Sequence, residues 1–134
     1  MGQYKLTQYE ATALSAATLA ANGMNPAAAW DVAAEKACGS ASTAKKGCPR
    51  STFLGLATVG AIAGVPPGKY SRTSDNASYA MKALQHLRLD ESLADRPEDL
   101  WRRVMNGDAK AYNQQMHVVA ALWRAKKIVR HAGA

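Results

Sequence analysis

The most chemically concentrated segment of the chain runs from Lys45 to Leu56 and reads Lys-Lys-Gly-Cys-Pro-Arg-Ser-Thr-Phe-Leu-Gly-Leu. It brings cations, a thiol and two hydroxyls to the point where an apolar helix is expected to begin. The free backbone amides of a helix N-terminus and the positive end of its dipole favour negative charge. We therefore predict an anion-binding site formed by the cations and hydroxyls of this segment: Lys45, Lys46, Arg50, Ser51 and Thr52.

Cys48, in the same segment, indicates a second chemistry. Neighbouring cations stabilise the thiolate, which is the nucleophilic form of cysteine. A nucleophile also needs a base, and the sequence offers His86 or His117, both distant along the chain. A cysteine that only packs in the core is the commoner case, so no residue is assigned as catalytic. Neither cysteine has the paired spacing of a zinc site, and we expect no metal and no cofactor.

The charge balance favours an anionic macromolecule as the partner, either nucleic acid or an acidic protein surface. The chain has 17 Lys and Arg against 10 Asp and Glu, a formal net charge of +7 at pH 7. Binding of nucleic acid by such cations weakens steeply with salt. We extend the predicted contact surface to cations on a glycine-rich segment and near the C-terminus: Lys69, Arg72, Arg124, Lys126 and Lys127.

A chain of 134 residues can bury one core without disulfide or metal crosslinks, so we predict a single domain over residues 1–134. Within it, residues 1–24 form an alanine-rich N-terminal helix, residues 25–125 the core and residues 126–134 a basic tail. Two cysteines are too few for a disulfide scaffold, and no apolar run reaches membrane-spanning length. We expect a reduced, cytoplasmic protein that is not inserted in a membrane.

Hydrophobic spacing and helix-boundary residues predict an all-α protein, a compact bundle of about five to six short helices packed orthogonally. Thr7 and Glu10 have the spacing of a capping box at the start of the first helix. The last helix is expected to begin at Asp108, to carry Tyr112 on its apolar stripe and to fray from Lys126 onward.

Residues 60–72 are rich in glycine and proline. The spacing of Gly60, Gly64 and Val65 is similar to the turn of a helix-turn-helix protein. The two prolines that follow Val65 would weaken the helix that should contact bases. We therefore expect a connection that packs Ile62 and Val65 under the core.

The block from Lys45 to Arg50, followed by Phe53-Leu54-Gly55-Leu56, resembles the signature of an uncharacterised bacterial family of small helical proteins. The resemblance covers about residues 28 to 125, so the first helix and the basic tail lie outside it. That family has no assigned activity. The resemblance therefore implies one helical domain and draws attention to Lys46, Cys48 and Asn113 without naming a reaction.

The leading hypothesis is a small, basic, non-enzymatic binding protein that engages an anionic partner. An inhibitor or accessory factor of nucleic-acid machinery belongs to this class. Two alternatives stay open. One is a Cys48-dependent enzyme whose helix N-terminus stabilises an oxyanion or a phosphate. The other is a structural or interaction subunit, in which the first helix packs against another chain, for example in a homo-oligomer.

Overall fold

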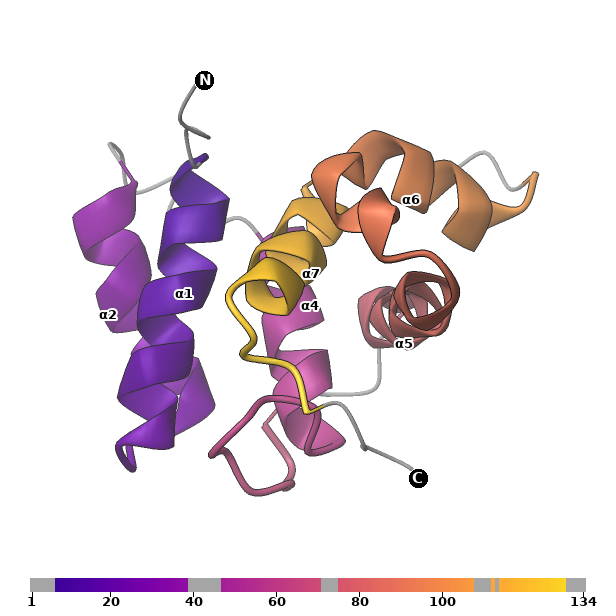
Figure 1. Ribbon diagram of the computed structural model, residues 1–134. Helices are drawn as coiled ribbons and strands as arrows, with labels where there is room; N and C mark the ends of the chain where they lie inside the picture. Colours follow the sequence, from indigo (N-terminus) through magenta and orange to yellow (C-terminus); the bar gives the residue numbers. More distant parts are fainter. Residues whose placement is uncertain (1–6, 39–46, 71–74, 108–111, 113, 130–134) are drawn as a thin grey trace.

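The computed structural model describes residues 7–38, 47–70, 75–107, 112 and 114–129, and of Gly47, Cys48 and Asp75 it describes the backbone alone. This part of the chain is helical, with no strand beyond one β-bridge, so the prediction of an all-α fold is confirmed. No helix in these ranges is both long and apolar enough to cross a membrane. The elements, labelled as in Figure 1, are α1 (Gln8–Ala21), α2 (Pro26–Ala37), α4 (Gly47–Thr58), α5 (Asp75–Leu89), the 3-10 helix η1 (Glu91–Asp95), α6 (Pro97–Met105) and α7 (Gln115–Arg124).

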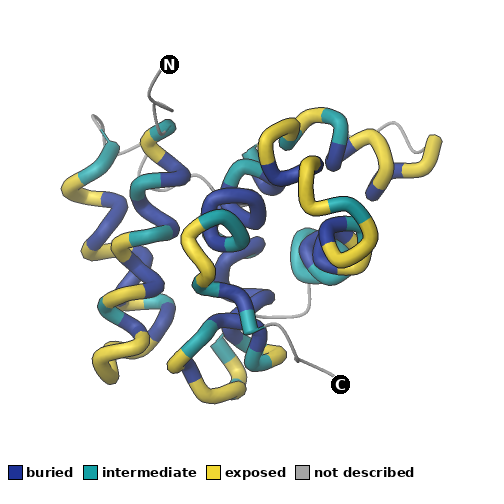
Figure 2. The backbone as a smooth tube through the Cα atoms, viewed as in Figure 1, coloured by how far each residue is buried: buried dark blue, intermediate teal, exposed yellow. Residues whose placement is uncertain are grey.

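The helices pack around α4, which contacts α2, α5 and α7. Figure 1 shows α1 and α2 as an antiparallel hairpin at one side of the molecule, with α7 between this hairpin and α5. It shows α5 nearly along its axis, whereas α1, α2 and α4 lie across the view. The helices therefore cross steeply. Buried residues gather where the helices face one another, and the exposed ones line the outer surfaces (Figure 2).

Local capping signals determine the α1–α2 hairpin. The Thr7 hydroxyl accepts a hydrogen bond from the Glu10 amide at 3.2 Å, and the Glu10 carboxylate accepts one from the Thr7 amide at 2.8 Å. This confirms the predicted capping box. Asn25 caps α2 by accepting from the Ala27 and Ala28 amides at 2.9 and 3.3 Å. The two helices approach closely because their shared face is almost entirely alanine: Ala13, Ala16, Ala17, Ala20, Ala29, Ala33 and Ala34 are buried.

A few large side chains fill the rest of the core. Trp30 of α2 packs against Phe53 of α4 with ring centroids 5.3 Å apart, and both side chains are buried. Gly55 allows α5 to pack directly on α4, because a Cβ atom at this position would lie 2.4 Å from the Cβ of Ala77. The Phe-Leu-Gly-Leu block of the sequence is thus a packing motif at the centre of the fold.

The last helix is shorter than the sequence predicts. Its expected start at Asp108 lies outside the described residues, and α7 begins at Gln115. Gln114 has a φ of 71°, a left-handed conformation through which an α-helix does not continue. Tyr112 therefore precedes the helix, and its ring packs against Trp101 with centroids 5.3 Å apart.

The frayed end predicted from Lys126 onward is wrong as far as Val129. Ile62 and Ile128 form an antiparallel β-bridge, flanked by backbone hydrogen bonds of 2.7 and 2.8 Å between the two segments. Both isoleucines are buried, and so is Val65. The residues after α7 therefore close the loop that follows α4, and the expectation that this loop packs its apolar residues under the core is confirmed.

Candidate anion-binding site

Two of the residues predicted to form an anion site at the N-terminus of α4, Arg50 and Thr52, are engaged within the fold. Thr52 is fully buried, so its hydroxyl is not a surface contact. Arg50 already has a counter-charge, because its guanidinium donates to both carboxylate oxygens of Asp31 on α2, at 2.9 and 3.2 Å. Ser51 is half-buried. Arg50 thus connects α4 to α2 and Thr52 belongs to the interior, which corrects the roles expected of these two residues; the anion site itself stays a prediction.

The lysines predicted on the glycine-rich segment and near the C-terminus are partly brought together. Lys69 and Lys126 are exposed, and Lys127 is half-buried. The bridge between Ile62 and Ile128 holds the segments that carry these lysines at one end of the molecule (Figure 1). Three further predicted cations lie outside the described residues: Lys45, Lys46 and Arg72.

Arg124 is not a solvated cation of a basic run. Its guanidinium donates to Glu10 Oε2 at 3.1 Å and to the Ala94 carbonyl at 2.9 Å, and Asp95 lies 3.9 Å away. Glu10 has no exposed surface, and its other oxygen accepts from the Thr7 amide. We call this contact the Glu10–Arg124 junction. It connects α7 to α1 and η1, which corrects the expectation that the charge of Arg124 is available to a polyanion.

His117, one of the two candidate bases, contacts the Tyr112 hydroxyl in the first turn of α7. Its backbone amide donates to the Tyr112 hydroxyl at 2.9 Å, and its Nδ1 contacts the same oxygen. This hydroxyl takes the place of an N-cap side chain, because Gln114 makes no capping hydrogen bond. Burial raises the pKa of Tyr112 and lowers that of His117. The imidazole is therefore neutral at pH 7.

His86, the other candidate base, lies in a cleft of about 390 Å³ between α5 and α6. Lys82, Gln85 and His86 follow one another at helical spacing, so they share one face of α5. We call this the α5–α6 cleft; its walls are Lys82, Gln85 and His86 of α5 and Arg103, Val104 and Asn106 from α6 and its C-cap. Val104 is buried, and the other five lining side chains are polar or charged.

The described residues that line the α5–α6 cleft include two permanent cations and no carboxylate. Within the described part of the chain, neither Lys82 nor Arg103 forms an ion pair. Arg103 also interacts with the carboxylate of Asp90. The pKa of Asp90 is lowered chiefly by a hydrogen bond from Ser92, with smaller contributions from Arg96 and Arg103. The cleft is therefore a region of positive potential.

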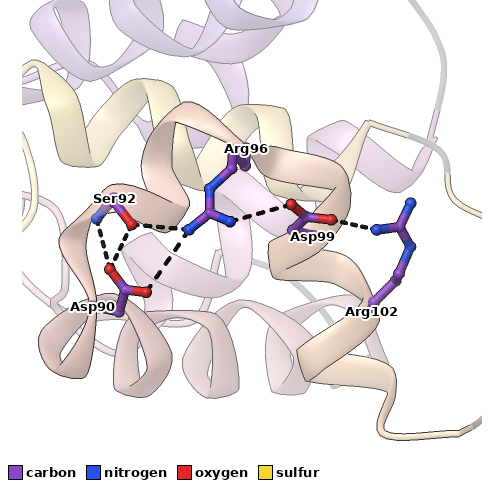
Figure 3. A network of polar contacts seen from close by, with 5 residues as sticks. All are labelled: Asp90, Ser92, Arg96, Asp99 and Arg102. Carbon is purple, nitrogen blue, oxygen red and sulfur yellow. Dashed lines mark hydrogen bonds and ion pairs between the residues drawn. The ribbon is translucent and has the colours of Figure 1, made fainter.

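The neighbouring arginines, Arg96 and Arg102, differ from Arg103 because both pair with carboxylates, as Figure 3 shows. Arg96 donates to the Ser92 hydroxyl at 2.9 Å and pairs with Asp99 at 3.4 Å and with Asp90 at 3.8 Å. Arg102 forms an ion pair with the other oxygen of Asp99. These five residues form a surface ladder in which the charges alternate in sign. In contrast, the α5–α6 cleft brings together two cations, Lys82 and Arg103, that have no such partner among the described residues.

The α5–α6 cleft was not among the sites predicted from the sequence. The spacing of Lys82, Gln85 and His86 was visible in the sequence and could have indicated a polar face on α5. Their alignment with Arg103 and Asn106 depends on how α5 and α6 pack, which no local pattern specifies. Asn106 lines the cleft at the C-terminal end of α6, where its backbone is left-handed, with a φ of 48°.

The described residues provide no geometric support for the hypothesis of a Cys48-dependent enzyme. The side chain of Cys48 lies outside the described part, so its reaction with His86 or His117 stays a prediction. Cys38 is a half-buried free thiol whose Sγ lies 4.0 Å from the Thr12 hydroxyl. Across the described ranges, no three His, Cys, Asp or Glu side chains are grouped so as to hold a metal ion.

Comparison with known proteins adds a family and no activity. No curated protein and no solved structure matches the chain. One family model matches residues 6–129. This range includes α1 and the residues that close the loop after α4, which corrects the narrower resemblance over residues 28 to 125. The chain belongs to this family, which is described as a family of unknown function, DUF6979.

Proposed function

We propose that this protein is a small, non-enzymatic binding module that engages an anionic partner through the α5–α6 cleft. The observation that carries the proposal is that Lys82 and Arg103 face one cleft and that no carboxylate is among its described lining residues. Elsewhere in the described chain, Arg50, Arg96, Arg102 and Arg124 all have acidic partners. A cation that is not paired with a carboxylate of the protein can attract a bound anion more strongly than one that is already paired.

The lining of the cleft suits an oxyanion. Arg103 offers a planar set of donors that can bind two oxygens at once, and Lys82 offers a compact point charge. The amides of Gln85 and Asn106 can donate further hydrogen bonds. The ring nitrogens of His86 offer a further hydrogen-bonding group at the same cleft. The net charge of +7 attracts anionic partners over a longer range.

The proposal includes nucleic acid and acidic protein surfaces as partners, and the inhibition of nucleic-acid machinery remains one role within it. The setting that we propose is the reducing cytoplasm, because two cysteines are too few for a disulfide scaffold.

The test is a double charge reversal, Lys82→Glu with Arg103→Glu. Binding is measured by fluorescence anisotropy with two labelled probes, a polyglutamate peptide and a single-stranded oligothymidylate. For the probe that binds, we expect the double variant to weaken affinity by about tenfold or more. The affinity of the wild-type protein should fall steeply as salt increases.

The matched control is Lys69→Glu with Lys126→Glu. It makes the same change in net charge at exposed positions outside the cleft. This variant should lose far less affinity than the cleft variant. Equal losses in both variants would show that only the overall charge matters, and unchanged binding in the cleft variant would exclude the cleft as the contact site.

A further inference from the structure

An exposed leucine stands next to the α5–α6 cleft. Leu89 is 87% exposed, the most of any large apolar side chain in the described part; the next, Val59, is 49% exposed. Leu89 follows His86 by three residues and Gln85 by four, so it belongs to the same face of α5. The cationic cleft thus continues along the helix into an apolar contact point.

We propose that the partner is an acidic segment of another protein that carries an apolar side chain next to its carboxylates. This inference rests on the proposed function and specifies the partner. The carboxylates bind Lys82 and Arg103, and the apolar side chain packs on Leu89. Binding removes the most exposed apolar surface of α5 from water, which gives affinity that charge alone does not supply.

The composition of this surface favours protein over nucleic acid. Proteins that bind single strands combine cations with aromatic side chains on which bases stack. The described lining of the cleft contains no Phe, Tyr or Trp, and the apolar residue next to it is aliphatic. A peptide offers what this surface can use: carboxylates for the cations, backbone groups for the amides of Gln85 and Asn106, and an aliphatic side chain for Leu89.

The experiment compares three labelled probes on the full chain. The first is a peptide of glutamate, aspartate and leucine; the second is the same peptide with every leucine replaced by serine; the third is oligothymidylate. We expect the leucine peptide to bind the wild-type protein roughly tenfold more tightly than the serine peptide. Leu89→Ser should remove this preference, and it should not affect folding because the side chain makes little contact with the protein.

The control variant is Val59→Ser, which removes another exposed apolar side chain outside the cleft. It should keep the full preference for the leucine peptide. Equal affinity of the two peptides for the wild-type protein, or a preference that survives Leu89→Ser, would overturn the inference about the partner.

The outcomes separate this inference from the proposed function. Tighter binding of oligothymidylate, lost on reversal of Lys82 and Arg103 and unchanged by Leu89→Ser, would support the cleft and reject the acidic protein segment. Failure of all three probes to respond to the charge reversal would reject both.

Discussion

Two groups of charged residues in this protein differ in whether the fold supplies them with an oppositely charged partner. At the Glu10–Arg124 junction, a carboxylate with no exposed surface pairs with a guanidinium that is 23% exposed, at 3.1 Å. In the α5–α6 cleft, Lys82 and Arg103 have no ion-pair partner among the described residues. The difference teaches that the position of a cation in the sequence does not decide its role. What decides it is whether the fold already supplies the counter-charge.

The junction and the cleft are expected to contribute to different properties, the junction to stability and the cleft to binding. The junction holds α1, α7 and η1 together, so changes there should alter the free energy of unfolding and leave the cleft intact. The cleft residues connect no elements through ion pairs, so changes there should alter binding and leave the free energy of unfolding almost unchanged.

Glu10→Ala should have the largest effect, a loss of about 3 kcal/mol in the free energy of unfolding. The change removes the carboxylate that accepts from the Thr7 amide, and it deprives Arg124 of a buried counter-charge. Urea-induced unfolding followed by circular dichroism measures the difference.

Glu35→Ala is the matched control, because Glu35 is exposed on α2. Its free energy of unfolding should stay within about 0.5 kcal/mol of the wild-type value. Under conditions where both variants are folded, each should bind the preferred probe as tightly as the wild-type protein. If Glu10→Ala were as stable as Glu35→Ala, the junction would be energetically no different from a surface contact and the comparison would fail.

Acidification should produce a smaller loss of stability through His117. Burial is the largest influence on this imidazole and lowers its pKa below 6.5; Glu10 and Glu98 raise the pKa and Arg124 lowers it. The unfolded chain therefore binds a proton at pH values where the folded protein keeps the ring neutral. The stability that follows is fully present above about pH 6.5 and is lost as the pH falls through the lowered pKa.

His117→Asn isolates this contribution, because the amide does not titrate and its oxygen can still accept from the Tyr112 hydroxyl. At neutral pH the variant should lose at most about 1 kcal/mol of stability. Unfolding free energies measured between about pH 7 and pH 5 should fall less steeply for the variant than for the wild-type protein. Parallel curves would mean that His117 titrates in the folded protein as it does in the unfolded chain.

Much of the fold could be predicted from the sequence because its signals are local. Thr7 and Glu10 are three residues apart, and their side chains form the predicted capping box. The last helix shows the limit of such patterns. The interval between Tyr112 and Met116 fits a helix, but the left-handed Gln114 lies between them and α7 begins after it.

The candidate site was far less predictable, because both kinds of charged group depend on contacts between distant residues. Arg124 lies 114 residues from Glu10, and nothing in the sequence around either residue identifies the other as its partner. For the same reason the sequence suggested that Arg50 was available to bind an anion, although Asp31 on α2 neutralises its charge. The cleft needs Lys82 and Arg103 on facing helices, an arrangement that follows from packing alone.

The ladder in Figure 3 should give the smallest effect and sharpens the comparison, since its charges are paired but exposed. Arg96 contacts Asp90, Ser92 and Asp99, and its side chain is 48% exposed. Arg96→Ala should lower the free energy of unfolding by less than about 1 kcal/mol, because solvent screens exposed pairs and ordering the side chains costs entropy. Denaturation of the wild-type protein and the variant at low and high salt measures this effect.

Salt distinguishes the ladder from the junction. Ions screen exposed charges and reach buried pairs much less, so the loss caused by Arg96→Ala should shrink at high salt. The loss caused by Glu10→Ala should stay nearly constant, because Glu10 has no exposed surface. If both losses fell together as salt increased, burial would not be what separates these charges.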